Sequence, residues 1–373
     1  MNTPCLVVAT TGRALARSAR RGAHPVFVLD LFADRDTRGY AAACRRLPAC
    51  GFAPGLEFDA EATIAAAGEF CPPPAPLVTG SGFENNPGLI GSLARGRPLF
   101  GNSPETVAAT KDPRRFFALL DRLDIPHPET TTLPPRHLDG WFVKTVGASG
   151  GIHVRPARPD DGNDPARYFQ RQVAGTGASV LFLADGRRAC IVGYNEQWVA
   201  GGPPAPFSYG GAINRMRMSA GMRARLAGDI DSLVEALGLV GLNGIDLIVR
   251  GDDYAVLEIN PRPTATIDLH DDHHIGGLFD LHVRACQGEL PESLRRSTVV
   301  RAHAVVYAPH DLRLDPSFRF PDWCSDLPAS DDWHPAGMPV CMVHATGTRV
   351  AAVKQLLHRR RAELENMINE PTA

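Results

Sequence analysis

The chain has 373 residues, a formal net charge of -2 and 44% hydrophobic residues. This length suffices for two or three domains with a substantial core. The near-neutral charge excludes a global attraction to nucleic acid or to an anionic membrane surface, and no apolar run is long enough to predict a membrane span. The first residues enter a strand-like segment without a preceding basic region, so we expect a cytoplasmic protein without a signal peptide.

The numbers of cysteines and lysines in the chain are informative. The eight cysteines form no C-x-x-C pair and are interpreted as small buried hydrophobic residues. Only three of the 39 basic residues are lysines, namely Lys111, Lys144 and Lys354. A chain that uses arginine almost everywhere is expected to keep lysine where a compact point charge is needed, such as beside a phosphate oxygen.

Residues 1–102 are predicted to form an N-terminal domain with a parallel sheet, because short apolar runs alternate with helical patterns. The expected elements are strands at 6–10, 25–30, 76–80 and 98–101 and a helix at 13–21. Gly12 and Asp30 have a spacing similar to that of a dinucleotide-binding unit, but the triple-glycine fingerprint is missing. We therefore expect an ordinary βαβ unit, with loops at the strand ends that are able to hold a ligand.

The next stretch contains two of the three lysines. Ser103 is a predicted N-cap with proline at the first helical position, and Lys111 comes just before a second Asp-Pro helix start. A strand at 141–144 ends in Lys144 and is followed by the glycine-rich loop TVGASGG. Such a loop is usually a flexible hairpin turn, but it can also bring backbone N–H groups close to phosphates. The adjacent Lys144 favours the phosphate site.

The segment from 168 to 237 is predicted to contain strand, hinge and strand (168–173, Gly175, 179–183), then another strand and a long Gly/Pro-rich loop, and finally a helix at 220–237. A loop of this length is usually functional or disordered. Arg215 and Arg217 follow it at strand spacing and would share one face. Either could clamp an anionic substrate group, although exposed arginines at this spacing are common.

Residues 241–266 predict a β-hairpin whose loop is Gly251-Asp252-Asp253. In this register Asp246 lies opposite Glu258, and both share one face with Asn260. The opposite face is then wholly apolar, and we expect it to consist of Ile245, Leu247, Val249, Ala255, Leu257 and Ile259. Two carboxylates and an amide oxygen suit a hard cation such as Mg²⁺; ordinary surface acids on a solvent-facing hairpin are the alternative.

The remaining residues contain a possible metal-binding cluster and predict a further structural unit. The cluster His270, Asp271, Asp272, His273 and His274 suggests a transition metal, but adjacent residues cannot all converge on one ion. We interpret it as a loop before the helix that closes the domain, in a position to touch substrate. From residue 298 the pattern predicts a new unit with two strands, at 299–309 and 337–347, and an amphipathic helix at 349–368 on which Lys354 faces solvent.

Four motifs, TKDPRRFF, FVKTVGASGG, YFQRQVAG and GIDLIV followed by LEINPRP, occur in an order that resembles the ATP-grasp superfamily. The resemblance implies α/β and α+β architecture with three parts: an N-terminal parallel α/β domain (1–102), an ATP-grasp domain of two lobes with its hinge near 170–176 (103–296), and a small C-terminal α+β extension (297–373). It also implies ATP and two Mg²⁺ ions between the lobes, for which Mn²⁺ can substitute, and it allows a homodimer.

The resemblance assigns roles to particular residues. The metal ligands would be Asp246, Glu258 and Asn260. The catalytic residues would be Lys144, Arg262 and Arg215, with Arg262 stabilising the transferring phosphoryl group or the acyl oxygen. The nucleotide would be held by Lys111, Lys144, Gly147, Ser149, Gly150, Gly151, Gln170, Gln172 and Val173. Many relatives have Glu in place of Gln170, and an acid near the ribose where this chain has Thr176-Gly177.

The implied reaction activates a small-molecule carboxylate as an acyl phosphate and joins it to an amine, releasing ADP and phosphate. The general likeness points to the branch that joins glutamate to an aromatic amine (tyramine or tyrosine) in making methanofuran-type one-carbon cofactors. A biotin carboxylase is disfavoured because the chain is shorter than such enzymes. The alternative of a different class is a nucleotide-binding regulatory module on the same fold, which would have no need to keep every lysine and metal ligand.

Overall fold

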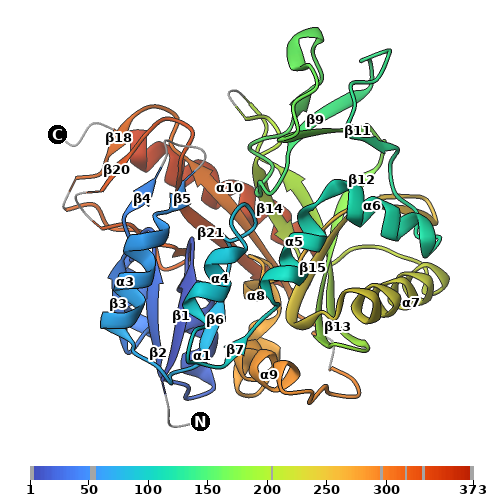
Figure 1. Cartoon of the computed structure of the whole chain (residues 1–373). Coiled ribbons are helices and arrows are strands. Elements are labelled where there is room, and N and C mark those ends of the chain that lie inside the picture. Colours follow the sequence, from blue (N-terminus) through green and yellow to red (C-terminus); the bar gives the residue numbers. More distant parts are fainter. Residues whose placement is uncertain are drawn as a thin grey trace.

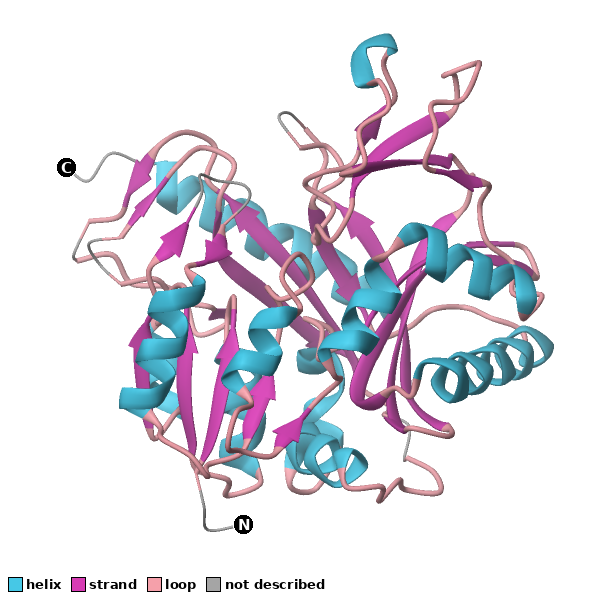
Figure 2. Cartoon of the chain, in the orientation of Figure 1, coloured by secondary structure: helices cyan, strands magenta, loops and turns pink. Residues whose placement is uncertain are grey.

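Three larger β-sheets with helices on their faces organise the chain (Figures 1 and 2). The computed structural model describes residues 4–50, 56–202, 205–294, 297–315, 317–329 and 332–369. None of the helices in these ranges is both long and apolar enough to cross a membrane.

The N-terminal domain contains a five-stranded parallel sheet in the order β3-β2-β1-β6-β7. Its elements are β1 (Cys5–Ala9), α1 (Arg13–Arg21), β2 (Val26–Asp30), α2 (Arg35–Tyr40), β3 (Ala43–Arg46), β4 (Ala49–Cys50), β5 (Glu57–Phe58), α3 (Ala60–Phe70), β6 (Leu77–Thr79), α4 (Gly88–Leu93) and β7 (Leu99–Phe100). Both faces of β1 are buried, as expected of a parallel strand. The strand order reverses between β1 and β6, and ligands of open α/β sheets bind outside the carboxyl ends of the strands at such a point.

Asp30 is a structural residue in this domain. Its side chain is fully buried and accepts hydrogen bonds from the backbone N–H groups of Gly12 (2.9 Å), Phe32 and Ala33. These bonds occupy the carboxylate that a dinucleotide site would need for the ribose. The expectation of an ordinary βαβ unit therefore agrees with the structure.

Two capped helices lead into the small lobe. Ser103 caps α5 (Pro104–Lys111) by accepting a bond from the Thr106 N–H, and Asp112 caps α6 (Pro113–Arg122), as the side-chain cap rule predicts. The small lobe is an antiparallel sheet in the order β10-β9-β11-β8. Its elements are β8 (Thr130–Thr131), β9 (Trp141–Thr145), β10 (Arg155–Pro156), the 3₁₀ turn η1 (Pro159–Asp161) and β11 (Arg167–Arg171).

The large sheet has eight strands in the order β16-β15-β12-β13-β14-β17-β21-β19. Its elements and the helices between them are β12 (Thr176–Asp185), β13 (Ala189–Val199), β14 (Tyr209–Ile213), α7 (Ala220–Leu237), β15 (Val240–Arg250), β16 (Asp253–Asn260), α8 (Ile267–His270), η2 (Asp271–His273), α9 (Gly277–Cys286), β17 (Val300–Tyr307), β19 (Cys324–Ser325), β21 (Pro339–Gly347) and α10 (Val350–Asn369). β18 (Leu312–Arg313) and β20 (Trp333–His334) pair separately. The strands after residue 297 thus continue the sheet that contains β12 to β16.

Alternating side chains of β12 fill two different cores. Val180 and Phe182 pack with residues of α6 and α7, whereas Leu181 and Leu183 pack with α9 and with α1 of the N-terminal domain. The second core fastens the N-terminal domain to the large sheet, as Figure 1 shows for α1 and α9. The long Gly/Pro-rich loop expected between the strand near residue 190 and the helix at 220–237 is wrong in one respect, because β14 lies within it and pairs with β13 and β17. Glycines at 210 and 211 concealed this strand.

Candidate active site

The hairpin of β15 and β16 places Asp246 opposite Glu258, as predicted. The expected three-residue loop is wrong, because Arg250 pairs with Asp253 and the turn consists of Gly251 and Asp252 alone. Two-residue turns with glycine at positive φ match the twist of the flanking strands, and Gly251 has φ +61°.

Because the turn has two residues instead of three, β16 has one residue more than β15 between the turn and the acidic pair. A β-bulge next to this pair accommodates it. The register shifts between Asp246 and Leu247, so that Leu247 pairs with Val256. As a result Tyr254 and Val256 face the core, and the prediction that Ala255 and Leu257 would do so is wrong. Bulges re-aim side chains near functional sites, and this one keeps both carboxylates on one face.

The two carboxylates have opposite electrostatic surroundings. The Asp246 carboxylate accepts hydrogen bonds from Gln197 Nε2 (3.1 Å) and Asn260 Nδ2 (2.9 Å). Burial and then the negative charge of Glu258 raise the pKa of Asp246 to about 7. Burial opposes ionisation of Glu258 as well, but the ammonium groups of Lys111 and Lys144 outweigh it and lower the pKa of Glu258 to about 2.

Lys111 and Lys144 both reach this site from different lobes. Lys111 Nζ, at the end of α5, lies 3.1 Å from Glu258 Oε2 and 3.4 Å from Asn260 Oδ1. Lys144 Nζ, on β9, donates to Gln170 Oε1 at 2.6 Å. Burial lowers the pKa of Lys144, while Glu258 and Asp246 oppose that shift. The structure therefore brings the two predicted phosphate-binding lysines to the predicted metal ligands.

The glycine-rich loop lies against two other segments. Gly147 and Gly151 have φ near +73°. A Cβ added at Gly147 would stand 2.8 Å from Glu84 O of the N-terminal domain, and one at Gly151 would stand 2.0 Å from Phe207 O. Tyr209 N–H also donates to Gly150 O at 3.0 Å. These positions need glycine because other backbone fills the space where a side chain would lie.

Arg262 joins the site to the N-terminal domain. Its Nε donates to Glu84 Oε1, and its Nη2 lies 3.4 Å from Asn260 Oδ1. Glu84 is 5% exposed, and its other oxygen accepts a bond from Gly82 N–H at 2.8 Å. Burial opposes ionisation of Glu84, but Arg262 and then Lys111 lower its pKa. The loop after β6, at the point where the strand order reverses, thus meets the metal-ligand face.

A small cavity of about 20 Å³ lies between the lobes. It is lined by Thr110, Lys111, Pro113, Phe116, Phe117, Thr145, Gly147, Ala148, Tyr168, Leu257 and Glu258. Aromatic and apolar side chains beside lysines suit a base and its phosphates. The cavity has room for about one water molecule.

The three predicted adenine contacts differ in their burial and in their hydrogen bonds. The Gln170 carboxamide is committed to Lys144 and to Thr130 Oγ1 (3.3 Å). Gln172 donates its backbone N–H to Gly140 O at 2.8 Å and its side chain is exposed. Val173 is half-buried, and neither Gln172 nor Val173 lines the small cavity.

Neither Arg215 nor the histidine-rich segment forms a hydrogen bond or ion pair with Asp246 or Glu258 in the described part of the chain. The Arg215 guanidinium bonds to the backbone oxygens of Asn214, Ser297 and Val299. Arg215 and Arg217 are not on a strand, so the expected strand spacing is wrong. The cluster at 270–274 forms α8 and η2, and no group of three or more His, Cys, Asp or Glu side chains among the described residues is arranged to hold a metal ion.

Three polar residues of the site were not singled out from the sequence. Glu84 and Gln197 contact Arg262 and Asp246, respectively. The His153 ring, in the glycine-rich loop, has a buried Nδ1 without a hydrogen-bond partner, and burial lowers its pKa to about 4. The signal for Glu84 was an acid in a loop after a parallel strand, the usual position of a ligand-binding residue.

Part of the chain is similar in sequence to a known domain family and to several known proteins. Residues 110–266 match the family described as ATP-grasp domain. The chain is 27% identical to the carbamoyl phosphate synthase large chain of Deinococcus radiodurans over an alignment of 197 positions, which covers 46% of this chain and 19% of that protein. It is 31% identical over 190 residues to the formate-dependent phosphoribosylglycinamide formyltransferase of Edwardsiella ictaluri, covering 44% of each chain. It therefore spans less than half the length of these relatives.

Solved structures agree over nearly the whole chain. A biotin carboxylase from Campylobacter jejuni has a TM-score of 0.71 at 14% identity, covering 94% of this chain and 89% of the other. An N5-carboxyaminoimidazole ribonucleotide synthetase from Thermotoga maritima has a TM-score of 0.67 at 14% identity, covering 96% and 98%. The coverage of the biotin carboxylase removes the length difference that had disfavoured that class, although identity at this level shows the fold alone. Residues 110–266 therefore form an ATP-grasp domain, and the chain as a whole has the ATP-grasp fold.

Proposed function

We propose that this protein is an ATP-dependent ligase that phosphorylates a small-molecule carboxylate and joins the resulting acyl group to an amine, releasing ADP and phosphate. The observation that carries the proposal is the meeting of Lys111, Lys144 and Arg262 with Asp246 and Glu258 beside a glycine-rich loop. Catalysis of phosphoryl transfer consists of positioning the reactants and neutralising their negative charge. The cationic side chains can bind the phosphates directly, and the carboxylates can bind a metal ion that does the same.

The donor set fits Mg²⁺. Asp246, Glu258 and Asn260 offer two carboxylates and one amide oxygen, connected by the Asn260–Asp246 bond of 2.9 Å. Mg²⁺ is typically bound by one or two carboxylates together with phosphate oxygens and water. Bound there, it would supply positive charge that neutralises the negative charge developing during transfer. We include two ions and exchange by Mn²⁺ in the proposal on the family resemblance.

The residues around the metal ligands have complementary tasks. Lys111, Lys144 and the backbone of the glycine-rich loop would hold the phosphates. Arg262 would face the acyl oxygen or the transferring phosphoryl group, held in place by Glu84. A carboxylate reacts with an amine only after its oxygen becomes a leaving group, which the acyl phosphate provides.

The narrower reaction, ligation of glutamate to an aromatic amine such as tyramine, is the first substrate pair to examine and rests on the family resemblance. The domain boundaries 1–102, 103–296 and 297–373 are likewise proposed on that basis; the boundary at 296 lies outside the described residues. A homodimer in solution is also part of the proposal, and size-exclusion chromatography with light scattering would test it.

ADP release tests the proposal directly. The full chain should release ADP and phosphate in one-to-one amounts when Mg²⁺, ATP, an acid and an amine are supplied, with the condensed product visible by mass spectrometry. With hydroxylamine in place of the amine, the acyl phosphate should be trapped as a hydroxamate. Stoichiometric AMP without ADP would contradict the acyl phosphate. Nucleotide binding without turnover on any acid and amine would favour the regulatory module.

A further inference from the structure

A second cluster of charged residues lies between the N-terminal domain and the last strands of the chain. We name it the acidic cluster, and it consists of Asp34, Asp36 and Asp326. Asp34 and Asp36 follow β2 at the carboxyl edge of the parallel sheet, and Asp326 follows β19. Asp36 accepts hydrogen bonds from the backbone N–H groups of Asp326 (2.9 Å) and Leu327 (3.0 Å), so the two segments are in contact.

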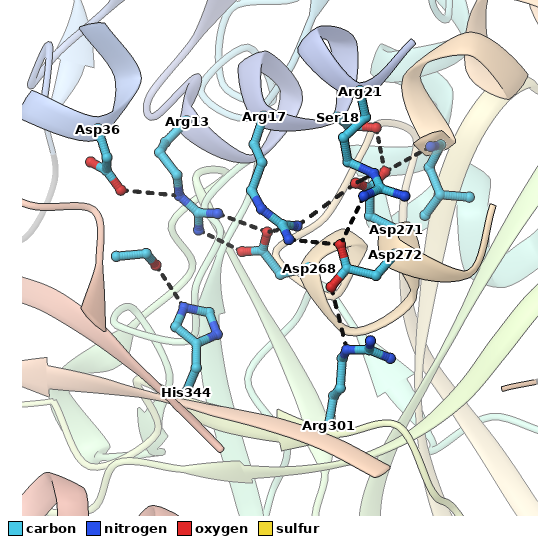
Figure 3. A network of polar contacts seen from close by, with 12 residues as sticks. Arg13, Arg17, Ser18, Arg21, Asp36, Asp268, Asp271, Asp272, Arg301 and His344 are labelled. Atoms are coloured by element: carbon cyan, nitrogen blue, oxygen red, sulfur yellow. Dashed lines mark hydrogen bonds and ion pairs between the residues drawn. The ribbon is translucent and has the colours of Figure 1, made fainter. Parts of the chain in front are cut away.

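The positive charge beside this cluster belongs to Arg13, which is already bonded to two carboxylates. Arg13 bonds to both carboxylate oxygens of Asp268, at 2.7 and 2.5 Å, and also to Asp326 at 2.9 and 3.1 Å. Asp36 lies 3.9 Å from the same guanidinium. Figure 3 shows Arg13 between Asp36 and Asp268. One buried arginine therefore serves several carboxylates, which leaves an excess of negative charge.

Asp34 has no partner among the described residues. It is 4% exposed, and no hydrogen bond or ion pair reaches its carboxylate, which does not cap α2. It lies within electrostatic range of Asp326, Asp30, Asp36 and Arg13. Burial, followed by the negative charges of Asp326, Asp30 and Asp36, raises the pKa of Asp34 to about 9. Buried carboxylates are normally paired, so this one calls for an explanation.

The cluster is connected to the proposed reaction centre. Thr11, which follows the end of β1, donates a hydrogen bond to Asp326 at 3.3 Å. The neighbouring strand β6 leads into the loop that contains Glu84, and Glu84 contacts Arg262. Tyr209 is in electrostatic range of both Asp246 and Asp268, and its hydroxyl lies 2.7 Å from His303 Nε2. The side chains of Asp36 and Asp326 are 13% and 19% exposed, so this edge of the cluster is in contact with solvent.

We propose that the acidic cluster binds a protonated amino group of one substrate, with Asp34 as its principal partner. This proposal rests on the ligase function above and names a substrate class: a molecule with an ammonium group separate from its reacting group. Such a group could be the α-ammonium of an amino acid whose side-chain carboxylate is activated, or the second ammonium of a diamine. In both cases an ammonium group would donate a charge-assisted hydrogen bond to the unpaired carboxylate of Asp34.

Equilibrium binding distinguishes this proposal from the reaction itself, because it needs no turnover. Calorimetry on the full chain with Mg²⁺ and ADP would compare L-glutamate with glutarate, and 1,4-diaminobutane with n-butylamine. Each pair differs by one ammonium group. We expect the ammonium-bearing member of one pair to bind at least about tenfold more tightly, and the pair concerned identifies the source of the cation.

Asp34→Asn removes the charge with little change in shape, and Asp139→Asn, in an exposed turn, is the matched control. The preference should vanish in the first variant and persist in the second, with ADP affinity unchanged in both. Asp34→Ser provides a second test should the asparagine variant fold poorly. No preference in either pair for the parent protein, or a preference that survives in a folded Asp34 variant, would overturn the proposal whether or not ADP release is observed.

Discussion

At the scale of single residues, the site depends on a few charges that are close enough to control one another. Lys111 forms an ion pair with Glu258 at 3.1 Å while its side chain is only 7% exposed. Asp246 is held by two amide groups instead, from Gln197 and Asn260. Glu258 is thus strongly ionised, whereas Asp246 retains a proton near neutrality. A divalent cation would stabilise the negative charge of both carboxylates.

Glu258→Gln should lower kcat for ADP release by about 100-fold or more, because the metal loses a negative ligand and with it transition-state stabilisation. The fold should persist, since Glu258 lies on the polar face of the hairpin and the core on the other face is unchanged. Steady-state kinetics over a range of Mg²⁺ concentrations, with thermal denaturation of both proteins, checks this. Near-normal turnover at ordinary Mg²⁺ would mean that Glu258 is not a ligand.

Lys144→Arg should raise the KM for ATP or lower kcat by at least about tenfold, equivalent to ~1.4 kcal/mol. The Lys144 ammonium sits 2.6 Å from Gln170 in a buried position, where a planar guanidinium is bulkier and requires a forked partner. Initial-rate kinetics at varied ATP measures the effect.

Lys354→Arg is the matched control for this substitution. The expectation that Lys354 faces solvent needs correction, because its Nζ lies 2.5 Å from Glu196 Oε1 on β13, with the lysine side chain 41% exposed. Arginine can keep this ion pair, so the variant should behave as the parent. Equal kinetics for all three proteins would contradict the assignment of Lys144 to the phosphates.

At the scale of elements, the glycine-rich loop between β9 and β10 couples the small lobe to the N-terminal domain. Gly147→Ala introduces both a positive-φ penalty of about 1 kcal/mol and a Cβ 2.8 Å from Glu84 O. We expect weaker ATP binding by about tenfold or more, because the loop must shift away from its phosphate-binding position. Calorimetric titration with ADP and Mg²⁺ measures this.

Gly251→Ala separates strain from collision. Gly251 has φ +61° in the hairpin turn, and nothing lies within 4 Å of a Cβ added there. This variant should lose about 1 kcal/mol of stability while keeping the parent's affinity for ADP. If both alanine variants bind ADP as the parent does, the loop does not contact the phosphates.

At the scale of the whole molecule, charged side chains of α1 fasten the N-terminal domain to the segment after the hairpin. Arg13, Arg17 and Arg21 meet Asp268, Asp271 and Asp272 in the network of Figure 3. Arg13 is 3% exposed and Asp268 is 7% exposed. Removing one member of such a buried pair leaves the other uncompensated, which costs several kcal/mol.

Acid should weaken this attachment in a defined direction. Burial opposes ionisation of Asp268, but Arg13 holds the pKa of its carboxyl well below the ordinary value of about 4. The stabilisation is therefore fully present above pH ~4 and is lost as pH falls through the lower folded-state pKa. The Tm of Asp268→Asn should lie well below that of the parent at pH 7, and the gap should narrow between pH 4 and 2. A constant gap across this range would contradict the assignment.

The sequence alone determined those features that arise from neighbours along the chain. Caps at Ser103 and Asp112, the boundaries of α7 and the pairing of Asp246 with Glu258 all depend on residues only a few positions apart or on a short hairpin. Side-chain alternation and capping act over these distances. The bulge remained hidden, because two registers shared the same acidic pair and only packing of Tyr254 and Val256 against α6 and α7 selected one.

Tertiary structure alone decided what the site contacts. Glu84 and Arg262 are 178 residues apart, and Arg13 and Asp268 are 255 apart. No periodic pattern relates such residues; they meet because the β12 core side chains Leu181 and Leu183 dock the N-terminal domain on the large sheet. The same docking brings the carboxyl edge of the parallel sheet to the proposed site and to Asp326. Local motifs therefore indicated the two lysines and the proposed metal ligands, but they gave no indication of the residues of the N-terminal domain that meet them.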